Sequence, residues 1–493
     1  MAVTSRMRSV GTLAAACLLA ALTPVLPPAA IALVVAALLL WLASVLVGYR
    51  FQGAGETRAW HPVLLVLTAF AVFTVTWNGF PPKQVSAPDL VLVAALVAVG
   101  YLWLQGRLEV PLPGWLVGTA GILITSQLLN QFFFVTDPPV DPPPSFTPPG
   151  PALVTMGKVE LGMLIVPIVV GAVASSWRRV NLLADLWLAS ATVSALIATF
   201  DGVTGAGLGA SITGIAVGSR SAGLAIHPNA FALTCAMALP VALLRAVQLR
   251  GWWRVVAIGT ACVLITGVLV SGSRLGLISV ALAIGLMALM IPKLRSRIIV
   301  IGVAAAALTL LLAPKNSALL EGFTRLSGGG DATQATSQRS DQLHDSLNIA
   351  LDHPVTGVGF TVIADAHTLP VQFWETGGFL GVIALVLFVT GGVLTGMRLR
   401  RDKRLPRDGP LLAGTLTISF AVWFISGLLQ NQIADRYIYV PLGLLLGLGV
   451  AAGANGVRRG RSEPVPVLTR PPVLAREPGA AVPREPERVP SHA

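Results

Sequence analysis

Apolar runs of roughly 20 residues, separated by short polar stretches, dominate the hydropathy pattern of this chain. A run of about 20 apolar residues spans a bilayer as a helix, and only helices and closed barrels satisfy the backbone in lipid. The runs lack the alternation of apolar and polar positions that is typical of barrel strands. The pattern therefore predicts an all-α, polytopic membrane helix bundle. The expected segments are 10–26, 29–48, 61–79, 89–105, 113–134, 153–175, 181–200, 227–246, 253–271, 275–292, 297–313, 373–396, 410–430 and 437–455.

These segments predict about 12–14 transmembrane helices, the lower number applying if short ones are re-entrant or interfacial. Of the 493 residues, 54% are hydrophobic and 11% are charged, against roughly 25% charged in soluble domains. Cys17, Cys235 and Cys262 fall in apolar segments without metal or disulfide spacing. The chain contains no GxxxxGK[ST] or GxGxxG motif, which argues against a cytoplasmic ATPase domain within it.

The basic residues are distributed very unequally between the two sides of the predicted bundle. With the amino terminus inside, 26 of the 34 Lys and Arg residues fall on the inner side, 7 fall outside, and Lys158 lies within a segment. This asymmetry predicts cytoplasmic amino and carboxyl termini in the cell (inner or plasma) membrane. It also explains the net charge of +12 without nucleic acid. The first segment is expected to be a retained helix rather than a cleaved signal peptide.

The polar stretches predict how the chain is divided. We expect amino-terminal transmembrane helices in 1–313, a large extracytoplasmic loop in 314–372, carboxyl-terminal transmembrane helices in 373–456 and a disordered cytoplasmic tail in 457–493. Residues 137–151 form a proline-rich outer loop, expected to be extended.

The large loop contains the sequence SDQLHDSLNIALDHP, which predicts an amphipathic helix ended by Pro354. Arg339 is expected at its start. Its apolar stripe would comprise Leu343, Leu347, Ala350 and Leu351. Such a helix would lie on the membrane surface and cover a cavity.

Arg220 and Arg274 are basic residues on the outer side, at the ends of apolar segments, where a guanidinium usually marks a site. Arginine grips phosphate oxygens with paired hydrogen bonds. Glycine and serine neighbours allow close backbone approach to an anion. The pair predicts an outward-facing site for a phosphorylated, lipid-linked substrate. The alternative is that both side chains merely reach toward lipid headgroups.

Further polar residues lie on the same side. His227 and Asn229 flank Pro228 at a helix start and either contact the donor phosphate or sugar or only begin the helix. His367 lies at a membrane boundary, where a histidine can take a proton from a hydroxyl; the alternative is a solvated loop residue. Glu375 would orient an acceptor or cap its helix.

Three other charged positions are weaker candidates. Arg339 could reach the same phosphate as the two outer arginines. Lys158 lies within an apolar segment, where a charge suggests function, so it is a candidate substrate-binding residue. Asp435 and Arg436 are expected to pair with each other at a helix end.

The order of these motifs resembles the family of O-antigen ligases and O-antigen polymerases. The series is GSRSAGLAIHPN (218–229), SGSR (271–274), an arginine before DHPVTGVGF (352–360), and H-x(7)-E-x-G-x(3)-G from His367. The resemblance covers about residues 215–445. Ala230-Phe231-Ala232 depart from the family, which often has a glycine or small residue after HPN.

The resemblance implies a GT-C-like fold and a membrane glycosyltransferase. Its donor would be a glycan on a polyprenyl pyrophosphate, its acceptor a hydroxyl on a glycan or lipid, and it would need no metal and no cofactor. Arg220 and Arg274 would hold the pyrophosphate, Arg339 would assist, and His367 would act as general base with inversion at the anomeric carbon.

Two other functions compete with this interpretation. A cell-wall polymerase of the shape, elongation and division type also uses lipid-linked donors, but its carboxylate motifs are not evident. A transporter or flippase of a lipid-linked anionic substrate usually has charges near the bilayer midplane and repeated halves, neither of which is visible here. The motifs do not separate ligase from polymerase, and they do not identify the sugar or the acceptor.

Overall fold

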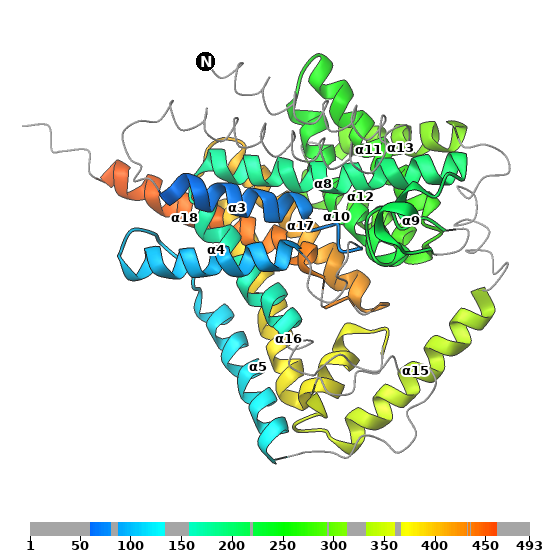
Figure 1. The fold of residues 1–493 in the computed structure, drawn as a ribbon. Coiled ribbons are helices and arrows are strands. Elements are labelled where there is room, and N and C mark those ends of the chain that lie inside the picture. The colour runs from blue at the N-terminus through cyan, green and yellow to red at the C-terminus, as the bar shows by residue number, and fades with distance from the viewer. Residues whose placement is uncertain are drawn as a thin grey trace, which may run out of the picture.

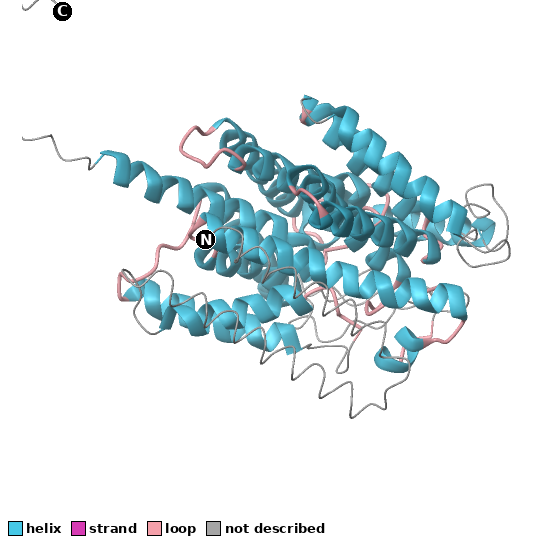
Figure 2. Ribbon diagram, turned by 90° about the horizontal axis from the view of Figure 1, so that it is seen from above, coloured by secondary structure: helices cyan, strands magenta, loops and turns pink. Residues whose placement is uncertain are grey.

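The computed structural model describes residues 60–79, 87–133, 157–216, 220–292, 295–312, 332–359, 366–430, 432–433 and 435–460. Helices and their connecting loops make up all of this part of the chain, and Figure 2 shows no strand in it. The all-α prediction is therefore confirmed. The predicted segments 10–26 and 29–48, the proline-rich loop 137–151 and nearly all of the tail 457–493 lie outside the described residues.

Each of the twelve predicted segments that reaches the described residues is helical. The helices are α3 (Trp60–Thr74), α4 (Ala87–Leu104), α5 (Gly114–Phe133), the π-helical turn η2 (Leu161–Ile165) with α7 (Val166–Val173), α8 (Trp177–Thr204), α10 (Pro228–Gln248), α11 (Trp252–Val270), α12 (Arg274–Met290), α13 (Arg295–Leu312), α16 (Leu369–Arg401), α17 (Gly409–Gly427) and the 3₁₀ turn η6 (Arg436–Tyr439) with α18 (Val440–Gly460). A short helix α9 (Leu208–Thr213) and the loop helix α15 (Ala332–Asp352) complete the set.

Six of the described helices are long and apolar enough to cross a membrane: α8, α10, α11, α16, α17 and η6 with α18. Shorter apolar helices occur within α3, α4, α5 and α12. The protein is thus a multi-pass membrane protein. The total of 12–14 spans and the division into 1–313, 314–372, 373–456 and 457–493 remain predictions, because they include residues outside the described part.

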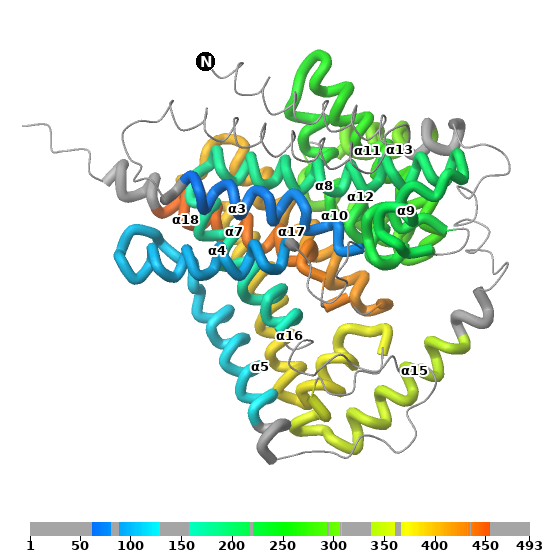
Figure 3. Tube along the Cα trace, in the orientation of Figure 1, coloured from blue at the N-terminus to red at the C-terminus, as the bar shows by residue number. Residues whose placement is uncertain are grey.

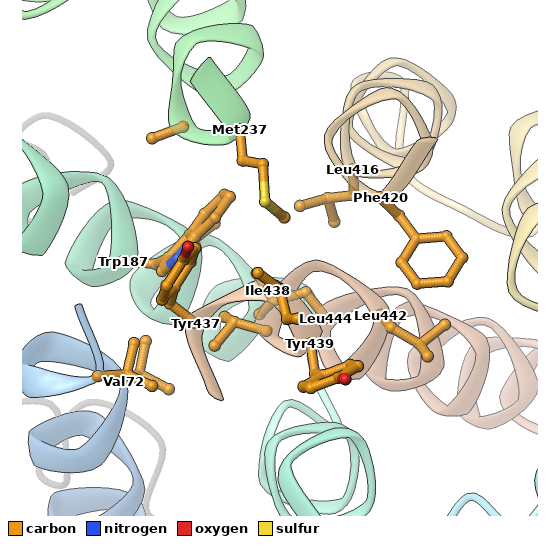
Figure 4. Packing of buried hydrophobic residues seen from close by; sticks show 14 of the residues in the cluster. Val72, Trp187, Met237, Leu416, Phe420, Tyr437, Ile438, Tyr439, Leu442 and Leu444 are labelled. Atoms are coloured by element: carbon orange, nitrogen blue, oxygen red, sulfur yellow. The ribbon is translucent and has the colours of Figure 1, made fainter. Parts of the chain in front are cut away.

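Helix α10 lies at the centre of the bundle and packs against α8, α11, α12 and α17. Most of its side chains are buried on all sides, as expected for a helix that is apolar all round. Figure 4 shows Met237 of this helix facing a packed layer that includes Trp187, Phe420 and Tyr437. Phe388 of α16 meets Trp423 and Tyr439 edge to face, with ring centroids 6.2 and 5.9 Å apart.

Serine and threonine side chains join some of the helices inside the bundle. The hydroxyls of Thr76 and Ser190 lie 2.5 Å apart between the end of α3 and α8. Those of Ser279 and Ser426 lie 2.7 Å apart between α12 and α17. Hydrogen bonds between small polar residues commonly associate helices in lipid. Apolar contacts alone do little there, because an apolar helix face packs about as well against lipid tails as against another helix.

Below the main bundle in Figure 1, α5 lies beside α16, and α15 packs against the amino-terminal part of α16. Helix α15 begins at Ala332, earlier than predicted, so Arg339 lies inside it rather than at its start. It ends at Asp352, as Pro354 predicts. The predicted apolar stripe is wrong at Leu351, which is 61% exposed, whereas Ser346 and Ala350 are fully buried. The chain trace in Figure 3 places this helix at the edge of the molecule.

Candidate active site

Arg220 lies in the segment between α9 and α10, half buried, where two acceptors hold its guanidinium. Its Nε donates a 2.7 Å hydrogen bond to the carbonyl oxygen of Ser271. Its Nη2 donates a 2.7 Å hydrogen bond to Oδ1 of Asn229. The backbone follows the same contact, because the Ser221 amide donates to the carbonyl of Val270 at 3.2 Å. Arg220 is therefore fixed against the end of α11.

The SGSR motif forms the tight turn between α11 and α12. Gly272 has a φ of 59°, a left-handed conformation that favours glycine. Ser273 is the N-cap of α12 and accepts the Gly276 amide at 3.1 Å. Arg274 is the first residue of that helix and is half buried. Because Ser271 both accepts from Arg220 and lies in this turn, the structure brings the two arginine motifs together.

The HPN motif begins α10. His227 is the N-cap residue, and its Nδ1 accepts the Asn229 amide at 3.1 Å. Pro228 occupies the first turn, where its missing N–H costs nothing. His227 is exposed, whereas Asn229 is buried with its side-chain oxygen against Arg220. Asn229 therefore supports an arginine from within the protein instead of facing outward.

Four predicted site residues, from three of the four motifs, lie in one neighbourhood around His227. The pKa of His227 is lowered from 6.5 to about 4, by burial first and then by Arg220, Arg339 and His367. Such an interaction requires the groups to be near one another. Helix α15 supplies Arg339, and the segment before α16 supplies His367. Residues far apart in the sequence therefore form a basic cluster of Arg220, His227, Arg339 and His367.

His367 has a strained backbone. Its φ of 50° is left-handed, and it is the non-glycine residue with positive φ in the described part of the chain. This conformation costs of order 1 kcal/mol for most residues and is enriched at functional sites. The next residue, Thr368, is the N-cap of α16 and accepts the Val371 amide at 3.4 Å. The Thr368 cap and the left-handed backbone of His367 together fix the position of the His367 Cα atom relative to α16.

The DHPVTGVG segment is inserted at a break in α16. Gly378, with φ 57° and ψ −154°, interrupts that helix. The Phe379 amide then donates to Pro354 at 2.8 Å, and the Val358 amide donates to the carbonyl of Glu375 at 2.8 Å. A side chain on Gly357 would collide with the backbone of Glu375 and Gly377. The glycines of both motifs thus allow the backbone of 354–358 to contact the backbone of α16 at its break.

Glu375 is fully buried within α16. Its Oε2 accepts from Nε2 of Gln372 at 3.4 Å, and Oε1 of Gln372 accepts the Ala366 amide at 3.3 Å. Gln372 is also fully buried. Glu375 is therefore connected through Gln372 to the backbone of Ala366, the residue before His367. It does not cap α16, because Thr368 does.

Lys158 belongs to a different group of charges. It interacts electrostatically with Arg436, Asp89 and Asp435. The expected pairing of Asp435 with Arg436 is wrong. Arg436 pairs with Asp89, with Nε 2.6 Å from Oδ1 and Nη2 donating to Oδ2 at 2.6 Å, and both residues are buried. A buried guanidinium needs a charged partner, which the Asp89 carboxylate provides, and Asp435 instead accepts from Nδ2 of Asn78 at 2.6 Å.

Sequence reasoning missed Asn78, Asp89 and Gln372. Asp89 had a usable indication, because it is an acidic residue at the start of an apolar segment. Asn78 also accepts the Ile226 amide at 2.9 Å, immediately before His227. Nothing in the local sequence distinguishes Asn78 or Gln372 from ordinary polar residues, since their partners lie far away or depend on the fold.

Comparison with known proteins agrees with the motifs. Residues 258–389 match the family model described as O-antigen ligase. The match includes Arg274, Arg339, His367 and Glu375, and the segment before it carries Arg220 and His227. No curated protein matches the chain. The helical membrane fold and the ordered motifs agree with this match, and residues 258–389 are thus similar to the O-antigen ligase family.

Proposed function

We propose that this protein transfers a glycan from a polyprenyl pyrophosphate carrier to an acceptor hydroxyl on the extracytoplasmic side of the cell membrane. The observation that carries the proposal is the basic cluster. Arg220, His227, Arg339 and His367 come from three separate parts of the chain and interact around one position. Arg274 joins them through the turn that accepts a hydrogen bond from Arg220.

Arg220 and Arg274 are the proposed pyrophosphate-binding residues. A departing pyrophosphate gains negative charge as its bond to the sugar breaks, and fixed cations stabilise that charge without reorganising. Ser271 and Asn229 hold the Arg220 guanidinium at 2.7 Å each, which supports such preorganisation. Arg339 would contribute a further positive charge from α15.

His367 is the proposed general base. The acceptor oxygen attacks the anomeric carbon as its proton passes to the imidazole, and the bond from the anomeric carbon to the pyrophosphate oxygen breaks with its electrons on that oxygen. Attack opposite the leaving group inverts the anomeric centre. The proposal needs no metal ion and no cofactor, because the arginines provide the charge stabilisation.

The proposed orientation rests on charge distribution. With both termini in the cytoplasm, the predominance of Lys and Arg falls on the inner side, as the positive-inside rule expects. Arg220, Arg274 and His367 then lie at the opposite face, where a lipid carrier can present its pyrophosphate and where the acceptor is available.

The test uses the purified full-length protein in lipid bilayers with a glycan linked to polyprenyl pyrophosphate and candidate acceptors, followed by gel electrophoresis and mass spectrometry. A ladder of repeat lengths would identify a polymerase, and one addition to a distinct acceptor would identify a ligase. If the wild type moves an intact donor across the bilayer without cleaving it, the protein is a transporter and the proposal is wrong.

Substitution of single residues tests the assigned roles. Arg274→Ala removes a guanidinium but leaves the Ser273 cap of α12 in place, and His367→Ala removes the base. Each is expected to lower turnover by at least about 100-fold. His344→Ala is a matched control, since His344 is exposed on α15. Folded Arg274→Ala or His367→Ala protein with full activity would contradict the corresponding role.

A further inference from the structure

One histidine of the basic cluster, His227, makes a hydrogen bond that fixes which nitrogen of its ring carries the proton. Nδ1 of His227 accepts the backbone amide of Asn229 at 3.1 Å. A ring nitrogen that accepts an N–H must carry a lone pair, so the proton of the neutral ring lies on Nε2. The tautomer follows from this N-cap hydrogen bond. A proton on Nδ1 would break the cap of α10.

The surroundings of His227 oppose a charged ring. Burial first, and then the charges of Arg220, Arg339 and His367, disfavour the imidazolium and lower the pKa of His227 from 6.5 to about 4. The side chain is nevertheless exposed. The hydrogen bond from the Asn229 amide and the neighbouring cations favour a neutral His227 ring even without the contribution of burial. His227 is therefore neutral at neutral pH and can be reached by a ligand.

We propose that His227 is a permanently neutral hydrogen-bond donor that presents Nε2–H to a pyrophosphate oxygen of the lipid-linked donor and takes no proton during the reaction. This inference rests on the proposed function and assigns different roles to the two histidines. His227 has its Nδ1 lone pair in the helix cap and its Nε2 already protonated, so neither nitrogen can accept a proton from an acceptor hydroxyl. The general-base role is left to His367.

A neutral donor suits this position physically. The pyrophosphate leaving group gains negative charge as its bond to the sugar breaks. A hydrogen bond aimed at that oxygen strengthens as the charge develops. A third cation beside Arg220 and Arg339 would repel both of them before any ligand arrived. A neutral N–H adds a donor to the site without adding that repulsion.

Two substitutions separate the two nitrogens of the ring. In His227→Asn the side-chain oxygen can cap α10, but the chain is too short to place a donor where Nε2 lies. In His227→Gln the terminal amide nitrogen reaches the Nε2 position, while the cap is weakened. We expect His227→Asn to lose about 100-fold in kcat and His227→Gln to retain most of it. His344→Asn, on the exposed face of α15, is the control.

The pH dependence of kcat/KM distinguishes a donor from a base. We expect the acidic limb of the profile to be unchanged in His227→Gln and to disappear with His367→Gln. Loss of the acidic limb in His227→Gln, or wild-type kcat in folded His227→Asn, would overturn the proposal.

A measurement on the wild type covers the case in which the variants fail to fold. Nitrogen-15 NMR of histidine-labelled protein at about pH 5, below the ordinary histidine pKa, should show a neutral ring with its proton on Nε2. Protonation of all 6 histidines at that pH would contradict the proposal. This result does not require turnover. If the wild type transfers no glycan but the neutral ring is present, the proposed function has failed and the assignment of the tautomer stands.

Discussion

Asn78 donates a 2.6 Å hydrogen bond from Nδ2 to Oδ1 of Asp435, a residue 357 positions further along the chain. The same amide accepts the backbone N–H of Ile226 at 2.9 Å through Oδ1. The next residue, Gly79, donates to the carbonyl of Leu224 at 3.0 Å. The end of α3 therefore holds the loop that leads into His227, although α3 lies outside the region that matches the family model.

This relationship predicts that Asn78 is a positioning residue. Asn78→Leu would leave the Ile226 amide and the Asp435 carboxylate without this buried partner, at a cost of about 1–3 kcal/mol each. We expect a lower melting temperature and a fall in kcat. In Asn78→Asp the acceptor for Ile226 remains, so its activity should lie between those of Asn78→Leu and the wild type. Gln105→Leu, at an exposed position, is the control. Equal melting temperature and kcat in Asn78→Leu would contradict this role.

The buried pair of Asp89 and Arg436 predicts a strongly asymmetric double-mutant cycle. Asp89→Asn leaves a guanidinium buried without its carboxylate, which typically costs about 3–5 kcal/mol. Replacing both residues, as in Asp89→Leu with Arg436→Met, removes the buried charge altogether and should recover much of that loss. Thermal unfolding in detergent measures the cycle. A double variant less stable than Asp89→Asn would show that the charges themselves are needed.

The hydropathy pattern predicts the membrane helices because lipid admits few alternatives: every backbone group must be paired within its own segment. Each predicted segment in the described residues is accordingly a helix, with ends shifted by a few residues. The start of α15 was less predictable. Residues 332–339 are polar and carry no apolar stripe, so their helical state depends on context that periodicity does not record.

The sequence predicts candidate site residues but not the contacts between them. In the sequence, Arg220 and Arg274 are recognisable as cations at the ends of apolar segments, whereas the contact between their motifs depends on a hydrogen bond from Arg220 to Ser271. The pairing of Arg436 with Asp89 was predicted wrongly, because a neighbour in sequence seemed sufficient while the fold supplied a better carboxylate 347 positions away. Long-range pairs of this kind are decided by packing, which no local pattern encodes.

The break in α16 predicts that Gly378 is irreplaceable. Its φ of 57° and ψ of −154° are accessible essentially to glycine alone, and an added Cβ would overlap the carbonyl of Val355. Gly378→Ala should unfold at a distinctly lower temperature and lose transfer activity. Gly121→Ala is the matched control, because Gly121 lies in α5 with open space around the position of a Cβ. Equal melting temperatures of Gly378→Ala and Gly121→Ala would show that the break in α16 does not require glycine.

The hydrogen bond from Arg220 to Asn229 predicts non-additive kinetics. If Asn229 acts by holding the guanidinium, Asn229→Ala should raise the KM for the lipid-linked donor, and less than Arg220→Ala does. The double variant should then resemble Arg220→Ala alone, since residues that act through one another do not add. Steady-state kinetics of the three variants provides the test, with Asn348→Ala on the exposed face of α15 as control. Fully additive effects would mean that Asn229 contacts the ligand by itself.

The buried side chains of Gln372 and Glu375 predict an effect confined to turnover. Oε1 of Gln372 accepts the Ala366 amide at 3.3 Å, and its Nε2 donates to Glu375 at 3.4 Å. Gln372→Leu removes the support of the strained segment that ends in His367, so the imidazole should leave its reactive position more often. Displacing the proposed base should lower kcat, whereas the proposed donor-binding residues Arg220 and Arg274 are unaffected, so the KM for the donor should change little. Gln372→Glu keeps an acceptor for the Ala366 amide but sets a second carboxyl against Glu375, and should recover at most part of the activity. An unchanged kcat in folded Gln372→Leu, or an increase in donor KM without a change in kcat, would show that Gln372 does not act through His367.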